Sequence, residues 1–300
     1  MRRVVAVVGP TAAGKSALAV GLAQQLAGEV VNADSMQLYE GMDVGTAKLR
    51  IGDRGGVAHH LLDVWPVTKT ASVAEYQVLA RSIIADLLAR GTTPIVVGGS
   101  GLYVRAALDV LEFPGTDAEM RAHLEQELAR LGAPALHARL ARLDPTAAAG
   151  ILPSNGRRIV RALEVLALGR GSFTATMPRY ESVYDVALLG VDREAAELDA
   201  RIERRVDTMW RDGLVDEVRR LADEHGLRGG LTASRALGYR QVLAMLDGEY
   251  PEGEARARTV RATKRFVRRQ RSWFRPDPRI RWLDDVSLDA ALGALAAARA

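Results

Sequence analysis

An octapeptide near the amino terminus has the residue types and spacing of a phosphate-binding loop. It reads Gly9, Pro10, Thr11, Ala12, Ala13, Gly14, Lys15 and Ser16, which matches the pattern G-x-x-x-x-G-K-[ST]. In such a loop the glycines let backbone N–H groups curl around phosphate oxygens, and the following helix adds positive potential. Lys15 would reach a terminal phosphate, and the Ser16 hydroxyl could bind Mg²⁺. The motif predicts that phosphates bind here, but it does not specify which bond breaks.

A second reactive group, Asp34, follows a predicted strand. It should therefore lie above the carboxyl edge of a sheet, beside the phosphate-binding loop. Its carboxylate could hold Mg²⁺ or accept a proton from a nucleophile, and nothing in charge or spacing separates these two roles. A purely structural turn through Asp34 and Ser35 is a third interpretation. Asp43 lies in a similar loop and is a less favoured candidate.

Two further patterns have both a chemical and a structural interpretation. The run Gly98–Gly101 could let a ligand approach the backbone closely, or it could form a tight turn that needs positive φ. The adjacent His59 and His60 suggest a metal site, but neighbouring residues rarely chelate one ion from a single element. No other histidine is near in sequence. A structural or positioning role for the histidine pair is therefore the better interpretation.

The composition is that of an ordinary globular protein. Apolar residues make up 48% of the 300 residues, and charged residues make up 26%. No apolar run approaches the roughly 20 residues that span a bilayer. The apolar stretch at residues 4–8 leads straight into the glycine loop without a cleavage site, so it predicts a strand rather than a signal peptide. The absence of cysteine excludes disulfides and thiolate zinc sites, and it fits a reducing cytosol.

Basic residues concentrate towards the carboxyl end, although the net charge is only +4. Of 41 basic residues, 37 are arginine, and eleven basic residues but one acid, Asp277, lie between Arg256 and Arg281. Aromatic residues are interleaved with them, a mixture that suits phosphate contact and base stacking. At helical spacing, one cationic stripe contains Arg261, Lys264, Arg265, Arg268 and Ser272. RNA phosphate is the best candidate for the partner of this stripe. Smaller basic clusters are Arg157, Arg158 and Arg161, and Arg201, Arg204 and Arg205.

The elements that must position these groups alternate between strand and helix. Buried β-branched runs predict strands at residues 3–8, 29–33, 94–97 and 184–191. Apolar periodicity and capping signals predict helices at residues 16–26, 72–90, 193–212, 214–224, 233–246 and 254–274. This order predicts an α/β fold with a P-loop NTPase-like parallel sheet covered on both faces. Residues 113–180 lack convincing strands, so we expect a helical insertion domain there, with residues 1–112 and 181–300 forming the core domain.

At this level the residues predict a P-loop enzyme that uses Mg²⁺ and carries an arginine-rich helix near its carboxyl end. A GTPase is disfavoured because the chain has no Asn-Lys-x-Asp motif. A small-molecule or nucleoside kinase remains open, because its phosphate-binding loop and catalytic aspartate would look the same.

Seven segments, taken in order, resemble the bacterial tRNA dimethylallyltransferase family along nearly the whole chain. They are Gly9–Ser16, Asn32–Lys48, His59–Asp63, Val97–Tyr103, Arg157–Val165, Arg235–Arg240 and Arg268–Arg275. The phosphate-binding loop alone is shared by many families, whereas the ordered set is highly specific. The resemblance implies that dimethylallyl diphosphate gives its prenyl group to N6 of the adenosine 3′-adjacent to the tRNA anticodon, releasing pyrophosphate.

The resemblance also implies roles for individual residues. Thr11, Lys15 and Ser16, with Mg²⁺, would neutralise the charge that builds on the departing diphosphate. Asp34 would accept the amine proton or hydrogen-bond N6, Ser100 would contact the substrates, and Arg205 would face the diphosphate. The target base would leave its stack to enter a closed channel. ATP hydrolysis is not expected.

The resemblance further implies contacts with the anticodon stem-loop of tRNA. The corresponding positions are Asp34, Ser35, Met36, Gln37, Ser100, Arg121, Arg157, Arg158, Ile159, Val160, Arg161, Arg235, Ala236, Leu237, Gly238, Tyr239, Arg240, Arg268, Arg269, Gln270, Arg271, Ser272, Trp273, Phe274 and Arg275. Three positions depart from the usual family pattern: Ser100 replaces threonine, Asn155 replaces a frequent aspartate, and residues 171–176 lack a Thr-Gly-Lys-Pro run. We expect a cytoplasmic monomer that does not attach to membranes.

Overall fold

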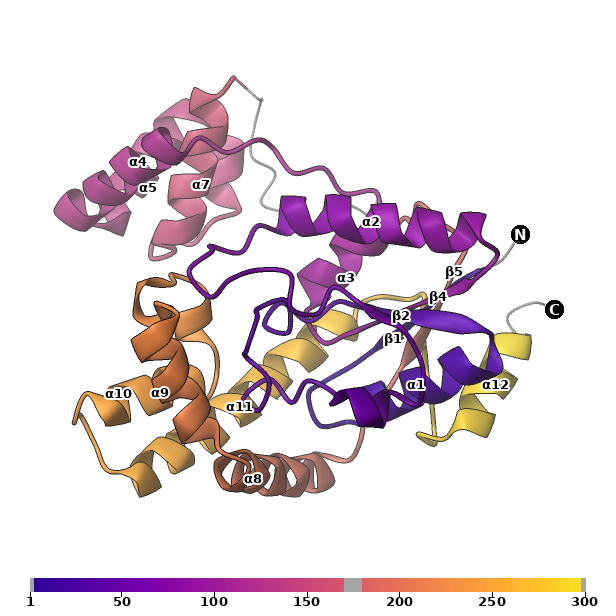
Figure 1. Ribbon diagram of the computed structural model, residues 1–300. Coiled ribbons are helices and arrows are strands. Elements are labelled where there is room, and N and C mark those ends of the chain that lie inside the picture. The colour runs from indigo at the N-terminus through magenta and orange to yellow at the C-terminus, as the bar shows by residue number, and fades with distance from the viewer. Residues whose placement is uncertain (1–2, 170–179, 298–300) are drawn as a thin grey trace. The chain divides into compact units, whose positions relative to one another are not determined.

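The computed structural model describes residues 3–169 and 180–297 (Figure 1). The chain divides into two compact units. The larger unit comprises Met1–Val110 and Ser182–Ala300, and the smaller unit comprises Leu111–Glu181. Residues 171–176, where the sequence departs from the family pattern, lie outside the described residues.

A six-stranded sheet forms the centre of the larger unit. Its strands are β1 (Val4–Val8), β2 (Gly28–Asn32), β3 (His59–His60), β4 (Thr93–Gly98), β5 (Val186–Gly190) and β6 (Ile280–Trp282). They lie in the order β3-β2-β4-β1-β5-β6, and every neighbouring pair is parallel. The central strand β1 is buried throughout, as its run of valine and alanine predicts. The predicted parallel α/β fold is confirmed, and this order brings the ends of β1, β2 and β4 side by side.

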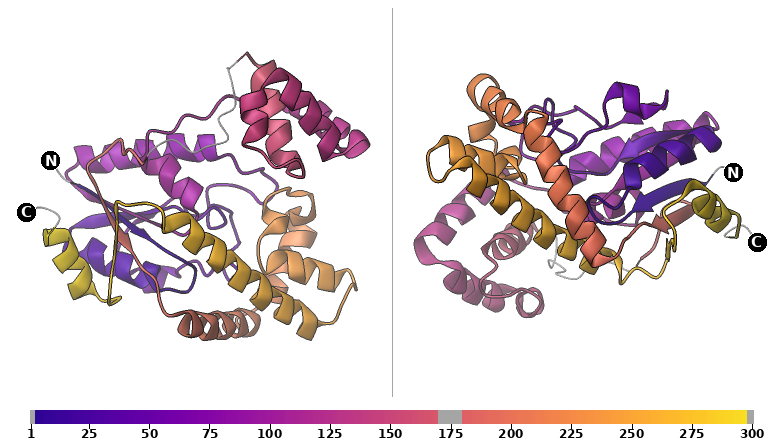
Figure 2. Two further views of the ribbon diagram at one scale, coloured as in Figure 1. Left: turned by 180° about the vertical axis from the view of Figure 1, so that it is seen from behind. Right: turned by 90° about the horizontal axis from the view of Figure 1, so that it is seen from below.

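Helices cover both faces of this sheet. Figure 1 shows α1 (Lys15–Gln25) and α12 (Leu288–Ala297) on one face and α2 (Val73–Ala89) and α3 (Gly101–Leu108) on the other. The remaining long helices of this unit are α8 (Ala195–Arg211), α9 (Leu214–Glu224), α10 (Tyr239–Leu246) and α11 (Glu252–Phe274). Both views in Figure 2 show α11 running beside α8 and reaching α10, with which it also packs. The longest basic segment of the chain, α11, therefore packs against other helices of the larger unit.

The prediction of one helix over residues 233–246 was wrong at its start. Residues Ala233–Arg235 form a 3₁₀ turn, and α10 begins only at Tyr239. Gly238 interrupts the run with φ of +87°, a conformation that glycine adopts without strain. The strand β6 and the helix α12 were not predicted.

The smaller unit is helical in its described residues. It contains α4 (Ala118–Leu131), α5 (Ala133–Leu143), α6 (Pro145–Ala149) and α7 (Gly156–Ala167). Leucines from α4 and α5 pack against Ile159 and Leu163 of α7 to form its core. Among the described residues of both units, none of the helices combines the length and apolar character that a bilayer crossing requires.

Candidate active site

The phosphate-binding loop connects β1 to α1 at the carboxyl edge of the sheet. Gly9 has φ of +143°, and a Cβ there would overlap the carbonyl of Val191 in the segment that follows β5. Gly14 has φ of +111° and immediately precedes the first turn of α1. Both glycines are therefore required by the backbone path, which brings Lys15 and Ser16 of the first turn of α1 into the cavity wall.

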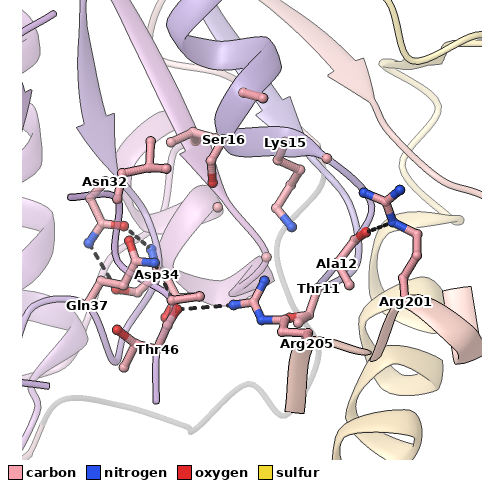
Figure 3. Close-up of a pocket in the computed structure, with 17 residues that line it drawn as sticks. Thr11, Ala12, Lys15, Ser16, Asn32, Asp34, Gln37, Thr46, Arg201 and Arg205 are labelled. Atoms are coloured by element: carbon pink, nitrogen blue, oxygen red, sulfur yellow. Dashed lines mark hydrogen bonds between the residues drawn. The ribbon is translucent and has the colours of Figure 1, made fainter. Parts of the chain in front are cut away.

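A cavity of about 340 Å³ opens at this loop (Figure 3). Its walls come from the phosphate-binding loop, the end of β2, the segment 37–49, the end of β4, and α8. Three cations, Lys15, Arg201 and Arg205, line it together with a single carboxylate, Asp34. The charged lining therefore carries an excess of two positive charges, which favours an anionic ligand.

Two cations of the cavity, Lys15 and Arg205, are poorly solvated. Lys15 Nζ donates to the Pro10 carbonyl at 2.7 Å. Desolvation lowers the pKa of Lys15 to about 8; Asp34 opposes this shift, whereas the charge of Arg205 adds to it. Burial also lowers the pKa of Arg205, again opposed by Asp34. Arg205 Nη2 donates to the Thr46 carbonyl at 3.2 Å, while its buried Nε has no hydrogen-bond partner in the described part of the chain. An anion in the cavity would relieve both groups.

Asp34 is held by a local turn immediately after β2. Its N–H donates to Asn32 Oδ1, and its own Oδ1 accepts the N–H of Met36, each at 2.9 Å. The structural role that the sequence left open is therefore real, but it uses only one carboxylate oxygen. Oδ2 has no hydrogen-bond partner within residues 3–169 and 180–297, and the carboxylate lines the cavity. Asp34 thus fixes the turn and still offers one oxygen for chemistry.

Ser100 lies beside the Asp34 turn. The Ser35 N–H donates to Ser100 Oγ at 3.3 Å, and the two hydroxyl oxygens are also 3.3 Å apart. The glycines around Ser100 are explained by close packing, not by the predicted positive φ, which none of them adopts. A Cβ on Gly98 would overlap the Ala33 backbone, and one on Gly101 would overlap the ring of Trp273. The prediction of a turn requiring left-handed backbone was therefore wrong in its reason.

The predicted tRNA-contact residues of the larger unit differ in their exposure. Arginines 235, 240, 268, 269 and 275 are exposed, as are Ser272 and, in part, Trp273. Arg271 is paired with Asp192 at 2.8 Å. Tyr239, Gln270 and Phe274 are buried, as are Ala236 and Gly238, and Leu237 is partly buried. These arginines are thus exposed to solvent, whereas several of the residues between them are buried.

In the smaller unit, only part of the predicted contact set is exposed. Arg157 and Arg158 reach solvent, whereas Ile159 and Val160 belong to the helical core. Arg121 and Arg161 both donate to Glu164 Oε2, at 2.7 and 2.8 Å. These two arginines therefore stabilise a buried carboxylate inside this unit.

Some contacts that shape the site have no signal in the sequence. Glu217 of α9 accepts the backbone N–H groups of residues 43, 44 and 45 and the hydroxyl of Tyr239. It thereby fixes the loop whose Thr46 carbonyl receives Arg205. Arg201 Nε donates to the Ala12 carbonyl at 2.7 Å, so α8 also supports the phosphate-binding loop (Figure 3). Apart from the Tyr239–Glu217 contact, these contacts join residues more than 150 positions apart, and no local sequence pattern predicts them.

The histidine pair has a structural position. His59 Nδ1 lies 2.9 Å from the Val57 carbonyl, and His60 Nε2 lies 2.6 Å from Glu29 Oε2. Both residues form β3 at the sheet edge. No group of three or more metal-binding side chains of the His, Cys, Asp or Glu type occurs in the described residues. These contacts support the structural interpretation of the pair.

A phosphate-binding loop at the end of the central strand of a parallel sheet, opening on a cationic cavity, defines a P-loop α/β protein. The family model described as IPP transferase matches residues 37–277, and the model described as isopentenyl transferase matches residues 2–53. The chain belongs to the IPP transferase family, so the family resemblance in the sequence is confirmed.

Individual relatives agree with this assignment. A tRNA dimethylallyltransferase of Acidothermus cellulolyticus is 70% identical over 99% of this chain and 93% of its own length. A tRNA dimethylallyltransferase of Streptomyces avermitilis is 67% identical over 96% of this chain and 92% of its own length. The crystal structure of a tRNA isopentenylpyrophosphate transferase from Bacillus halodurans is 37% identical, covers 100% of this chain and 96% of that chain, and superposes with a TM-score of 0.72.

Proposed function

We propose that the cavity at Gly9–Ser16 holds the diphosphate of dimethylallyl diphosphate while the prenyl group moves to N6 of the adenosine 3′-adjacent to a tRNA anticodon. Family membership makes the chain a prenyltransferase that acts on tRNA. The observation that carries the donor assignment is the charge of the cavity, where three cations meet one carboxylate. The kinase alternative is not favoured, because the relatives are transferases of the tRNA-modifying type.

The proposed reaction breaks one bond and forms one bond. The allylic C–O bond of the donor breaks and leaves its electron pair on the diphosphate, while N6 forms a C–N bond to the same carbon. Lys15 and Arg205 would stabilise the negative charge that develops on the leaving oxygens, because fixed charges in a poorly solvated cavity need no reorganisation. Pyrophosphate is the product that remains in the cavity.

We assign the acceptor base to the side of the cavity that Asp34 lines. As the C–N bond forms, N6 must lose one proton, and Oδ2 of Asp34 would accept it; the position of Asp34 in the cavity wall supports this role. Ser100, held beside Ser35, would orient the incoming base. The base would be unstacked from a single-stranded loop, as is usual when proteins do chemistry on a nucleobase.

Mg²⁺ is the metal that this chemistry calls for, and the residues present fit it. The Ser16 hydroxyl lines the cavity, and Mg²⁺ commonly takes one or two protein oxygens together with phosphate oxygens and water. When bound, the ion would add positive charge at the leaving group. We further propose that the enzyme acts as a monomer in the cytoplasm, where it would meet the anticodon stem-loop of its tRNA.

Transfer of a labelled prenyl group tests this function directly. Dimethylallyl diphosphate labelled in its prenyl carbons is incubated with unmodified tRNA, and the label is located after digestion to nucleosides. Label on N6 of the adenosine 3′ to the anticodon, with one pyrophosphate released per label, is the expected result. Consumption of ATP with no label in the RNA would overturn the proposal in favour of a kinase.

A further inference from the structure

Gln270 is a buried amide near the carboxyl end of the basic helix α11, with only 4% of its surface exposed. Its Oε1 accepts the N–H of Thr11 at 2.9 Å, and its Nε2 donates to the Gly99 carbonyl at 2.9 Å. One side chain therefore joins the phosphate-binding loop after β1 to the loop after β4.

The Gly98–Gly101 run is shaped to receive this helix. A Cβ on Gly99 would overlap Gln270 Nε2, and a Cβ on Gly101 would overlap Trp273, one helical turn further along. Two glycines of one loop thus admit two side chains of α11 at i and i+3 spacing. Because Gly99 and Gly101 have no side chain, the backbone of this loop approaches α11 more closely than it could with any other residue type at these two positions.

The opposite side of the same helical turn faces solvent. Arg268, Arg269 and Ser272 are exposed around the buried Gln270. One turn of α11 therefore carries arginines directed outwards and an amide bonded to the phosphate-binding loop.

We propose that Gln270 is a positioning residue for prenyl transfer, which holds Thr11 and Gly99 at a fixed separation. Ser100 follows Gly99 directly. The amide would therefore set the distance between the phosphate-binding loop, which would hold the diphosphate, and Ser100, which would contact the acceptor base. The inference rests on the proposed function for the identity of the diphosphate. An amide suits the position because one contact requires an acceptor and the other requires a donor.

Two variants of Gln270 distinguish a positioning role in prenyl transfer from a role in protein stability alone. Gln270→Met keeps the length of the side chain and removes both hydrogen bonds, and Gln270→Glu keeps the acceptor for Thr11 but loses the donor to Gly99. A matched control is Gln241→Met, because Gln241 is also buried and accepts a backbone N–H, from Gly238, at 2.9 Å. The measurements are the dissociation constant of inorganic pyrophosphate, kcat and KM for labelled transfer, tRNA affinity, and the melting temperature.

We expect Gln270→Met to weaken pyrophosphate binding and to lower kcat/KM by about tenfold or more, the size of one or two lost buried hydrogen bonds. Its tRNA affinity should stay within about twofold of the wild type, and Gln241→Met should lose stability without these kinetic changes. For Gln270→Glu, activity relative to the wild type should rise as pH falls, because only the protonated carboxyl can donate to Gly99. This pH response also provides the test if Gln270→Met does not fold.

Two results would overturn the inference. One is wild-type pyrophosphate affinity and kcat in Gln270→Met with only a lower melting temperature, and the other is a flat relative pH profile for Gln270→Glu. If the wild-type protein itself failed to bind pyrophosphate, the proposed function would be contradicted, and the diphosphate role of Gln270 with it.

Discussion

At the scale of the residue, the cavity depends on a balance between desolvation and charge. Arg205 lies close enough to Lys15 to disfavour its charge, burial lowers the pKa of both cations, and Asp34 compensates only in part. Such a pair of cations is costly to bury without an anion. The proposed diphosphate would supply the missing negative charge.

The replacement Asp34→Ala should reduce turnover by about 10²-fold or more, because general bases typically contribute that much. Affinity for tRNA should remain within a few fold. Single-turnover transfer of labelled prenyl groups and a tRNA binding assay measure the two quantities. Asp34→Asn is the matched control, because its amide oxygen can still accept the Met36 N–H while its charge is lost. Asp34→Asn should therefore be as inactive as Asp34→Ala, and wild-type turnover in either variant would refute the assignment.

The pKa of Lys15 near 8 predicts a pH dependence of pyrophosphate binding. The lowered pKa means that the free protein loses the Lys15 proton as pH rises through about 8, so the attraction for pyrophosphate should weaken above that pH. Pyrophosphate also titrates, so the comparison must be made with Lys15→Met, which should bind weakly and lack this component of the pH dependence. Parallel pH profiles for both proteins would show that Lys15 does not cause the change.

At the scale of the element, the two faces of α11 lie in different environments. Its inner face contacts the loops after β1 and β4 through Gln270, and its outer face carries arginines. The predicted cationic stripe is largely exposed, although Lys264 is paired with Glu203 of α8 at 2.7 Å and Arg261 with Glu254 at 2.9 Å. Arg268 and Arg269 are therefore the better candidates for phosphate contacts.

The double replacement Arg268→Ala with Arg269→Ala should weaken tRNA binding to a similar degree for all sequences. The slope of log K against log salt should fall by about 2, because each lost phosphate contact releases one counterion fewer. Titrations of tRNA at several salt concentrations measure this slope. Arg219→Ala provides the control, because Arg219 is exposed on α9 but pairs with Asp216 at 2.7 Å. An unchanged slope in the double variant would place the RNA contacts on another surface.

At the scale of the whole molecule, the cationic cavity and the buried carboxylate of Glu164 belong to different units. Every residue that lines the cavity belongs to the larger unit. In the smaller unit, the side chain of Glu164 is fully buried and accepts hydrogen bonds from Arg121, Arg161 and the Asp117 N–H. Burial raises the pKa of Glu164, but these hydrogen bonds outweigh burial and the net pKa is lowered.

The replacement Glu164→Gln should therefore destabilise the smaller unit by about 1–3 kcal/mol at neutral pH. Because the folded pKa is lowered, the stabilisation by Glu164 is present above its unfolded pKa and is lost as pH falls through its folded pKa. The difference between variant and wild type should thus shrink in acid. Hydrogen exchange resolved by unit measures this effect, and pyrophosphate affinity serves as the internal control. A loss of pyrophosphate affinity equal to the loss of stability would contradict the independence of the cavity.

Several features of the molecule follow from contiguous stretches of sequence. The strand at Val4–Val8, the loop after it and α1 are adjacent along the chain, so their valines, glycines and Lys15 predict strand, turn and phosphate site together. The three-residue strand β6 lacked any such signal, because its register depends on β5, some 90 positions away. The break at Gly238 had a local signal, the glycine itself, which helical periodicity around it concealed.

The sequence by itself determined the parallel α/β fold, the family and the position of the phosphate-binding loop, because each of these resides in short runs of neighbouring residues. Only the tertiary structure decided how Gln270, Glu217 and Arg205 reach that loop or its neighbours. Their partners lie between 22 and 259 positions away. Which distant side chains meet depends on how helices pack over the sheet, and no local pattern encodes that packing.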